Sequence, residues 1–281
     1  MQLSSYRRLV LGLQSARMDV AVLRAAASLA KSLGLEMHAI LVENQSLLRA
    51  ANLPMTRELV LPTYDWRPAN PDRLLGELND EAQIVRSRIA HEMREFGIEC
   101  GFEVRRGDPA IAVTEHCSVR DIIAVIDSVD AIERLSGMAK RMRHAALTSK
   151  SSVLLLPPLA AVRSEGPVVA VASDFRDQTL VVASHIAKVS GRALVVLMAT
   201  TTGGGVAPPD RATVQSLAEP SVSCVLRTLD GRRDCFLVMN RSAIDLTPPS
   251  TFDHLATDIG MPVLMTEASP TISRPPKGKV T

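Results

Sequence analysis

The side chains best suited to chemistry in this sequence are six histidines and four cysteines, spread along the whole chain. The cysteines, which are Cys100, Cys117, Cys224 and Cys235, form no C-x-x-C pair, and no histidine stands at zinc-finger spacing from them. No histidine belongs to an H-E-x-x-H motif or pairs with a serine in a G-x-S-x-G elbow. The sequence therefore predicts neither a metal centre nor catalytic residues, and we expect buried free thiols in a reducing compartment.

A glycine-rich loop is the other feature that could hold a ligand. Gly203, Gly204 and Gly205 follow a predicted strand, and consecutive glycines let backbone N–H groups approach a phosphate. A P-loop also needs a Lys-Ser or Lys-Thr step and a helix that starts directly after it. Neither follows here, so we expect a flexible loop.

The composition excludes several classes of protein. The chain has 281 residues with 32 Lys and Arg against 30 Asp and Glu, and the net charge of +2 is too small for a protein that coats a phosphate backbone. Aromatic residues make up 3%, too few for base-stacking platforms. No stretch reaches the roughly 18 apolar residues of a membrane helix, and the first apolar run ends at Leu13, too early for an export signal. We expect a cytoplasmic protein with no nucleic-acid partner and no membrane insertion.

Strands and helices alternate along the first half of the chain. Short aliphatic runs predict strands at 8–13, 37–42, 99–105, 121–126 and 152–156, and apolar periodicity predicts helices at 18–33, 72–96, 110–117 and 138–147. Gly97 is placed to end the second helix, and Asp108-Pro109 to start the third. Because short joints link strand, helix and strand, these strands should be parallel. A proline-rich arm at 44–72 interrupts the pattern.

The same plan starts again after a Pro- and Ala-containing stretch. Strands are predicted at 167–172, 193–198, 222–226, 235–239 and 261–265, and helices at 177–190, 210–217 and 250–259. This internal repeat predicts an α/β fold of two tandem doubly wound units, each a five-stranded parallel sheet flanked by helices. The second copy lacks the long second helix. The expected domains are 1–158, with the arm, and 167–268, joined by a linker at 159–166 and followed by a disordered tail at 269–281.

Three segments of the first half carry a family likeness. The run Arg106-Gly107-Asp108-Pro109-Ala110, the strand Asp121–Ile126 and the helix with Arg143-His144-Ala145 before Val153–Pro157 resemble the universal stress protein family. The likeness covers nearly the whole chain as two copies and is closer in the first. It implies a sheet of strand order 3-2-1-4-5 in each copy. Family members commonly dimerise through their fifth strands, so the resemblance implies an intramolecular pairing of the two domains, with a homodimer as a further arrangement.

The resemblance also indicates where a nucleotide would bind. Many members bind ATP with an acidic residue at the end of the first strand, a Gly-x-x-Gly loop after the fourth and a Gly-Ser/Thr step at the last helix. This sequence departs from each element, because the matching positions hold Gln14, Ser15, Asp127, Ser136 and Gly137 in the first copy and Ser173, Asp174, Asn240 and Arg241 in the second. A carboxylate beside a triphosphate costs about 1 kcal/mol or more in a partly wet site. We therefore expect no bound cofactor, with ATP as the one candidate.

Three functions remain open from the sequence. The favoured one is a non-catalytic stress-response or regulatory binding protein whose ATP binding is weak or lost. The second is an ATP- or AMP-binding protein, or a weak ATPase, that uses the cleft at the carboxyl ends of the strands of one domain. The third is a sensor that contacts a protein partner through the arm at 44–72 or through the basic helix with Lys140, Arg141, Arg143 and His144.

Overall fold

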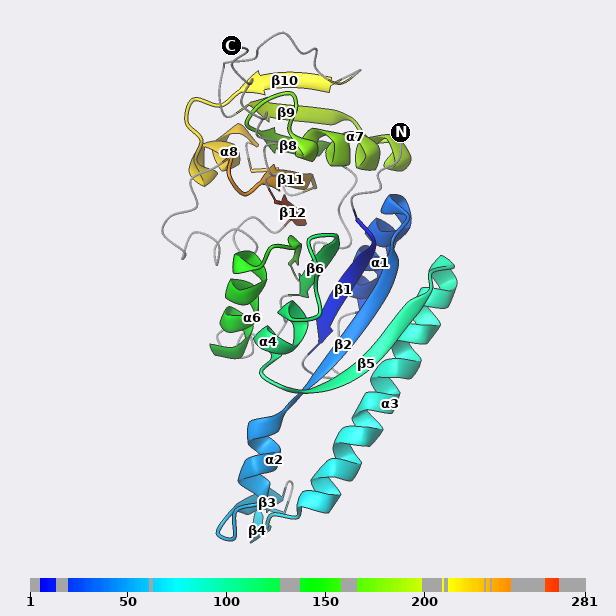
Figure 1. Ribbon diagram of the computed structural model, residues 1–281, viewed down its shortest axis with the longest axis vertical. Coiled ribbons are helices and arrows are strands. Elements are labelled where there is room, and N and C mark those ends of the chain that lie inside the picture. Colours follow the sequence, from blue (N-terminus) through cyan, green and yellow to red (C-terminus); the bar gives the residue numbers. More distant parts are fainter. Residues whose placement is uncertain are drawn as a thin grey trace, which may run out of the picture.

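Aliphatic strands that are buried on both faces form the centre of the molecule (Figure 1). The computed structural model describes residues 6–13, 20–60, 63–126, 137–157, 166–198, 209, 212–229, 231–232, 234–243 and 261–267. Here the first half means residues 6–157 and the second half residues 166–267. Ten strands form one sheet and two more form a separate hairpin within the described residues.

The strands of the sheet are short and divide equally between the two halves. The first half contributes β1 (Arg8–Leu13), β2 (Glu36–Asn44), β5 (Cys100–Gly107), β6 (Asp121–Ile126) and β7 (Ser152–Leu156). The second half contributes β8 (Val168–Ala172), β9 (Leu194–Met198), β10 (Ala212–Ser216), β11 (Phe236–Asn240) and β12 (Val263–Thr266).

The order of strands across the sheet is β10-β9-β8-β11-β12-β7-β6-β1-β2-β5. Within each half the strands are parallel. Numbered by their order in that half and counted from the outer edge of the sheet inward, they run third, second, first, fourth and fifth. The halves meet where β12 pairs with β7, and this pair is antiparallel. Its three matched positions are all buried, and they are Val263 with Leu155, Leu264 with Leu154, and Met265 with Val153.

Helices cover both faces of the sheet, which gives the three-layered α/β architecture expected from the sequence (Figure 1). One face packs against α1 (Val20–Leu33), α3 (Pro71–Phe96) and α7 (Gln178–Ser190). The other packs against α4 (Pro109–Thr114), α6 (Gly137–Thr148) and α8 (Val222–Thr228). Side chains alternate along β1 accordingly, because Leu9 and Leu11 join the first core and Val10 joins the second.

Capping contacts confirm two of the predicted helix boundaries, the start of α4 and the end of α3. Asp108 is the N-cap of α4, where its Oδ1 accepts a hydrogen bond of 2.9 Å from the Ala110 N–H, and Pro109 occupies the first helical turn. Gly97 ends α3 in the left-handed region, at φ 66°. Sequence reasoning therefore located these two helix boundaries correctly.

Two predicted elements of the second half are wrong. Residues 222–226 lie in helix α8 rather than in a strand, since Ser221 caps the helix through a 3.3 Å bond from the Cys224 N–H, and Val222 and Val225 pack on the sheet from one helix face. The predicted helix at 210–217 contains strand β10, whose exposed residues pair with β9 at the sheet edge. The predicted helix at 250–259 and the tail lie outside the described residues.

The arm at 44–72 is more ordered than the sequence indicates. It contains α2 (Gln45–Ala51) and an antiparallel hairpin of β3 (Arg57–Val60) and β4 (Asp65–Pro68). The arm connects β2 to the long helix α3 and projects beyond the sheet (Figure 1). No described helix is long and apolar enough to cross a membrane.

Candidate functional site

The sheet topology points to one crevice in each half. In doubly wound sheets ligands bind outside the carboxyl ends of the strands, where the strand order reverses. This switch point lies between β1 and β6 in the first half and between β8 and β11 in the second. The first crevice involves loops outside the described residues, including Gln14, Ser15, Asp127 and Ser136, and Gly137 begins α6. In the second half, the carboxyl ends of β8 and β11 and the first residues after each strand are described.

A single carboxylate, that of Asp177, organises the second crevice. Its Oδ1 accepts a hydrogen bond of 2.9 Å from the Thr179 N–H, which makes Asp177 the N-cap of α7. Its Oδ2 accepts a 3.3 Å bond from the Ser173 N–H, at the end of β8, and a 2.8 Å bond from the Asn240 amide. The last bond crosses the crevice, because Asn240 is the final residue of β11.

Asn240 is bonded at both ends of its amide. Its Oδ1 accepts bonds from the Ser242 N–H at 2.9 Å and from the Ser242 hydroxyl at 2.8 Å. Thr179 and Thr266 are both buried, and their hydroxyls lie 2.6 Å apart. Polar side chains that bond to one another therefore join the described ends of β8 and β11.

The four candidate residues in the second half separate into two groups. Ser173 and Asn240 meet at Asp177, as described above. Asp174 is exposed, and its Oδ1 accepts a 2.7 Å bond from the Arg176 N–H within the same loop. Sequence reasoning missed Asp177, although an aspartate two residues before Thr179 at a helix start is a recognisable capping signal.

Arg241 turns away from the crevice and binds the first half of the chain. Its Nη1 donates to the carbonyls of Leu147 at 2.8 Å and Ser149 at 2.7 Å, and its Nη2 donates to the carbonyl of Ser151. These carbonyls lie at the end of α6 and in the turn before β7. Burial lowers the pKa of the Arg241 guanidinium. This side chain is a contact between the halves rather than a solvated surface residue or an anion ligand.

The described histidines and thiols form no catalytic constellation. The His185 Nε2 lies 3.1 Å from the Ser32 carbonyl, and the His38 Nε2 lies 3.7 Å from a Glu103 carboxylate oxygen. Burial raises the pKa of Cys100 to about 11 and that of Cys117 to about 12, which disfavours the nucleophilic thiolate. No group of three metal-ligating side chains occurs among the described residues.

Comparison with known proteins shows which solved structures have a similar fold. No protein-family model and no curated protein matches the sequence. A universal stress protein from Archaeoglobus fulgidus DSM 4304 superposes with a TM-score of 0.63 at 16% identity, over 95% of this chain and 99% of that one. A putative universal stress protein from Pseudomonas aeruginosa UCBPP-PA14 gives 0.51 at 13% identity, over 94% of each chain.

A third solved structure, a protein of unknown function from Pseudomonas aeruginosa PAO1, gives a TM-score of 0.51 at 12% identity over 94% of each chain. At these identities the likeness concerns the fold. The chain thus has an α/β fold with a mostly parallel sheet flanked by helices, similar to that of universal stress proteins.

Proposed function

We propose that this protein is a non-catalytic stress-response or regulatory binding protein of the universal stress type whose ATP binding is weak or lost, and that its second half takes up no nucleotide. The observation that carries the proposal is the hydrogen bond of 2.8 Å from Asn240 to Asp177, which spans the second switch point. The resemblance of the fold to universal stress proteins supports the class, and the bonded crevice supports the loss of nucleotide binding.

The cost of admitting a phosphate at this place has two parts. A nucleotide that enters the crevice has to separate Asn240 from Asp177, and a buried polar group left unpaired costs roughly 1–3 kcal/mol. The phosphate then stands beside the Asp177 carboxylate, and two like charges about 4 Å apart repel by about 1–4 kcal/mol between bulk water and a protein surface. A network that already satisfies its own members therefore opposes binding.

Equilibrium titration with ATP tests the proposal on the whole protein. Protein freed of nucleotide is titrated with Mg-ATP by calorimetry, and we expect no micromolar binding. The variant Asp177→Asn removes the charge but keeps a capping residue, and Asp127→Asn is the matched change in the first half. Micromolar affinity in the unaltered protein contradicts the proposal. Release of phosphate or AMP on incubation with Mg-ATP indicates an enzyme instead.

The arm is the part of the protein that we assign to a protein partner. Exposed large apolar side chains gather on it, with Met55 91% exposed, Trp66 59% exposed, and Leu53 and Tyr64 also exposed. Tryptophan, tyrosine and methionine are enriched in protein–protein interfaces, and this arm holds one or more of each in exposed positions. The projection of the arm beyond the sheet leaves this surface accessible (Figure 1).

Affinity capture from extracts of the source cells tests the arm. The double variant Met55→Ser/Trp66→Ser removes apolar surface without shortening the chain, and Ile84→Ser, at an exposed position on α3, is the matched control. We expect a protein captured by the unaltered chain to be recovered with the control variant and lost with the double variant. Equal recovery with all three chains would show that the arm is not the contact.

A further inference from the structure

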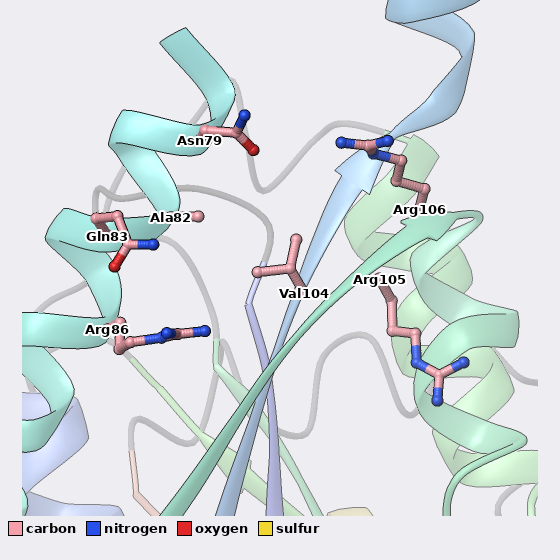
Figure 2. Close-up of a pocket in the computed structure, with 7 residues that line it drawn as sticks. All are labelled: Asn79, Ala82, Gln83, Arg86, Val104, Arg105 and Arg106. Atoms are coloured by element: carbon pink, nitrogen blue, oxygen red, sulfur yellow. The ribbon is translucent and has the colours of Figure 1, made fainter. Parts of the chain in front are cut away.

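An open surface cavity lies away from both switch points, between α3 and the edge strand β5 (Figure 2). Its volume is about 510 Å³, within the range of about 300–1,000 Å³ that small-molecule sites occupy. Nothing in the proposed function uses this cavity.

The side chains that line it from α3 belong to one helix face. Asn79, Ala82, Gln83 and Arg86 recur at the i, i+3, i+4, i+7 spacing that brings side chains together on a helix. Figure 2 shows Asn79, Gln83 and Arg86 on the side of α3 that faces the end of β5. The helix therefore presents two carboxamides and one guanidinium to the cavity.

Strand β5 contributes the opposite wall. Val104 and Arg106 share one face of the strand, and Arg105 lies on the other, because strand side chains alternate. Arg105 points away from the cavity in Figure 2, and its Nε lies 2.6 Å from a carboxylate oxygen of Glu103. Arg86 and Arg106 are thus two cations on opposite walls of the cavity, one from α3 and one from β5.

Both of these arginines are held in place while keeping donors free. The Arg86 guanidinium carbon lies 5.1 Å from the centroid of the Phe102 ring, a cation–π distance that leaves its N–H edge unused. Arg106 Nε donates to Glu43 Oε2 at 2.8 Å. In the described part of the chain no ion pair is found for Arg86, and Arg106 has that one alone.

Glu43 supplies an independent sign that a polar partner is missing. Its side chain is 3% exposed, and its Oε1 has no hydrogen-bond partner within the described part of the chain. Buried carboxylate oxygens are normally satisfied, and this one lies in the partner of Arg106, although Glu43 does not itself line the cavity.

We propose that this cavity binds a small phosphate monoester that carries hydroxyl groups, such as a sugar phosphate. Two arginines match the charge and the several acceptor oxygens of a phosphate group. The amides of Asn79 and Gln83 both donate and accept hydrogen bonds, which suits hydroxyl groups. Ala82 and Val104 supply the apolar surface between these polar groups.

Calorimetric titration of the full-length protein with ribose 5-phosphate tests this site. We expect saturable binding that weakens about tenfold or more in Arg86→Gln and in Arg106→Gln, as loss of a charge-assisted bond predicts. Arg88→Gln removes the same charge from the same helix outside the cavity and should bind as the unaltered protein does. Inorganic phosphate should bind more weakly, and ribose not at all.

Several outcomes would overturn the proposal. These are no saturable binding of ribose 5-phosphate, equal affinity in Arg86→Gln and Arg88→Gln, or tighter binding of a carboxylate probe such as citrate. Arg106→Gln removes the ion-pair partner of the buried Glu43 carboxylate and could prevent folding. Arg86 is exposed, so Arg86→Gln tests the site even in that case. Asp177→Asn should leave this binding unchanged, which separates the cavity from the switch point.

Discussion

At the scale of single residues, Arg241 shows how position decides the role of a charged side chain. It follows the last residue of β11, where the resemblance to universal stress proteins implies a phosphate-binding loop. Its guanidinium instead donates to three carbonyls more than 85 residues earlier in the chain. Only arginine has enough donors in a planar fork for this arrangement.

We expect Arg241→Gln to lower the free energy of unfolding by roughly 1–3 kcal/mol, because partly buried carbonyls lose their donors. Urea denaturation followed by circular dichroism measures the change. Arg176→Gln, at an exposed position of the same half, is the control and should stay within about 0.5 kcal/mol of the unaltered protein. Equal effects of the two variants would show that Arg241 does not stabilise the contact between the halves.

The thiols give a pH-dependent prediction at the same scale. Burial raises the pKa of Cys100 and Cys235 to about 11, so iodoacetamide at pH 8 should label them about a hundredfold more slowly than unfolded protein. Peptide mass spectrometry measures the labelling. Above pH 9, the ordinary thiol pKa, the unfolded chain releases protons that the folded chain retains. The free energy of unfolding should therefore fall between pH 9 and 11.

At the scale of elements, α3 shows how two glycines in one helix differ. Gly97 ends the helix at φ 66°, where an L side chain is strained. Gly76 lies inside the helix, exposed, with open space around the position of a Cβ atom. Both positions hold glycine, but only the left-handed backbone conformation of Gly97 disfavours a side chain.

We therefore expect two alanine substitutions in α3 to have opposite signs. Gly97→Ala should lower the free energy of unfolding by about 1 kcal/mol, and Gly76→Ala should raise it by roughly 0.5–1 kcal/mol through helix propensity and chain entropy. The urea midpoint at constant slope reports both. A shift in the same direction for both variants would contradict the assigned conformation of Gly97.

At the scale of the whole molecule, the two halves share one sheet. The β7–β12 pair is buried, and Arg241 adds hydrogen bonds to the carbonyls of Leu147 and Ser149 in the other half. His185 of α7 reaches the carbonyl of Ser32 at the end of α1, on the other side of the same boundary. Neither half can expose its fifth strand without losing these contacts.

We expect one cooperative thermal transition for the whole chain, with equal calorimetric and van 't Hoff enthalpies. Leu264→Lys, which places a charge at a fully buried position of β12, should lower the transition temperature of both halves together. Ile84→Lys on the surface of α3 is the control for an added charge. Two separate transitions in the unaltered protein would show that the halves unfold independently.

The sequence by itself determined the local elements of this protein. Aliphatic runs marked all the buried strands of the first half, and the Asp108-Pro109 and Gly97 signals marked helix ends, because capping and hydrophobic periodicity act over a few residues. The tertiary structure alone decided the remainder. The antiparallel direction of the β7–β12 pair, the carbonyls that Arg241 meets, the helical state of α8 and the bond between Asn240 and Asp177 all depend on contacts between distant residues. Local propensity is too weak to determine such contacts, since packing and long-range hydrogen bonds override it.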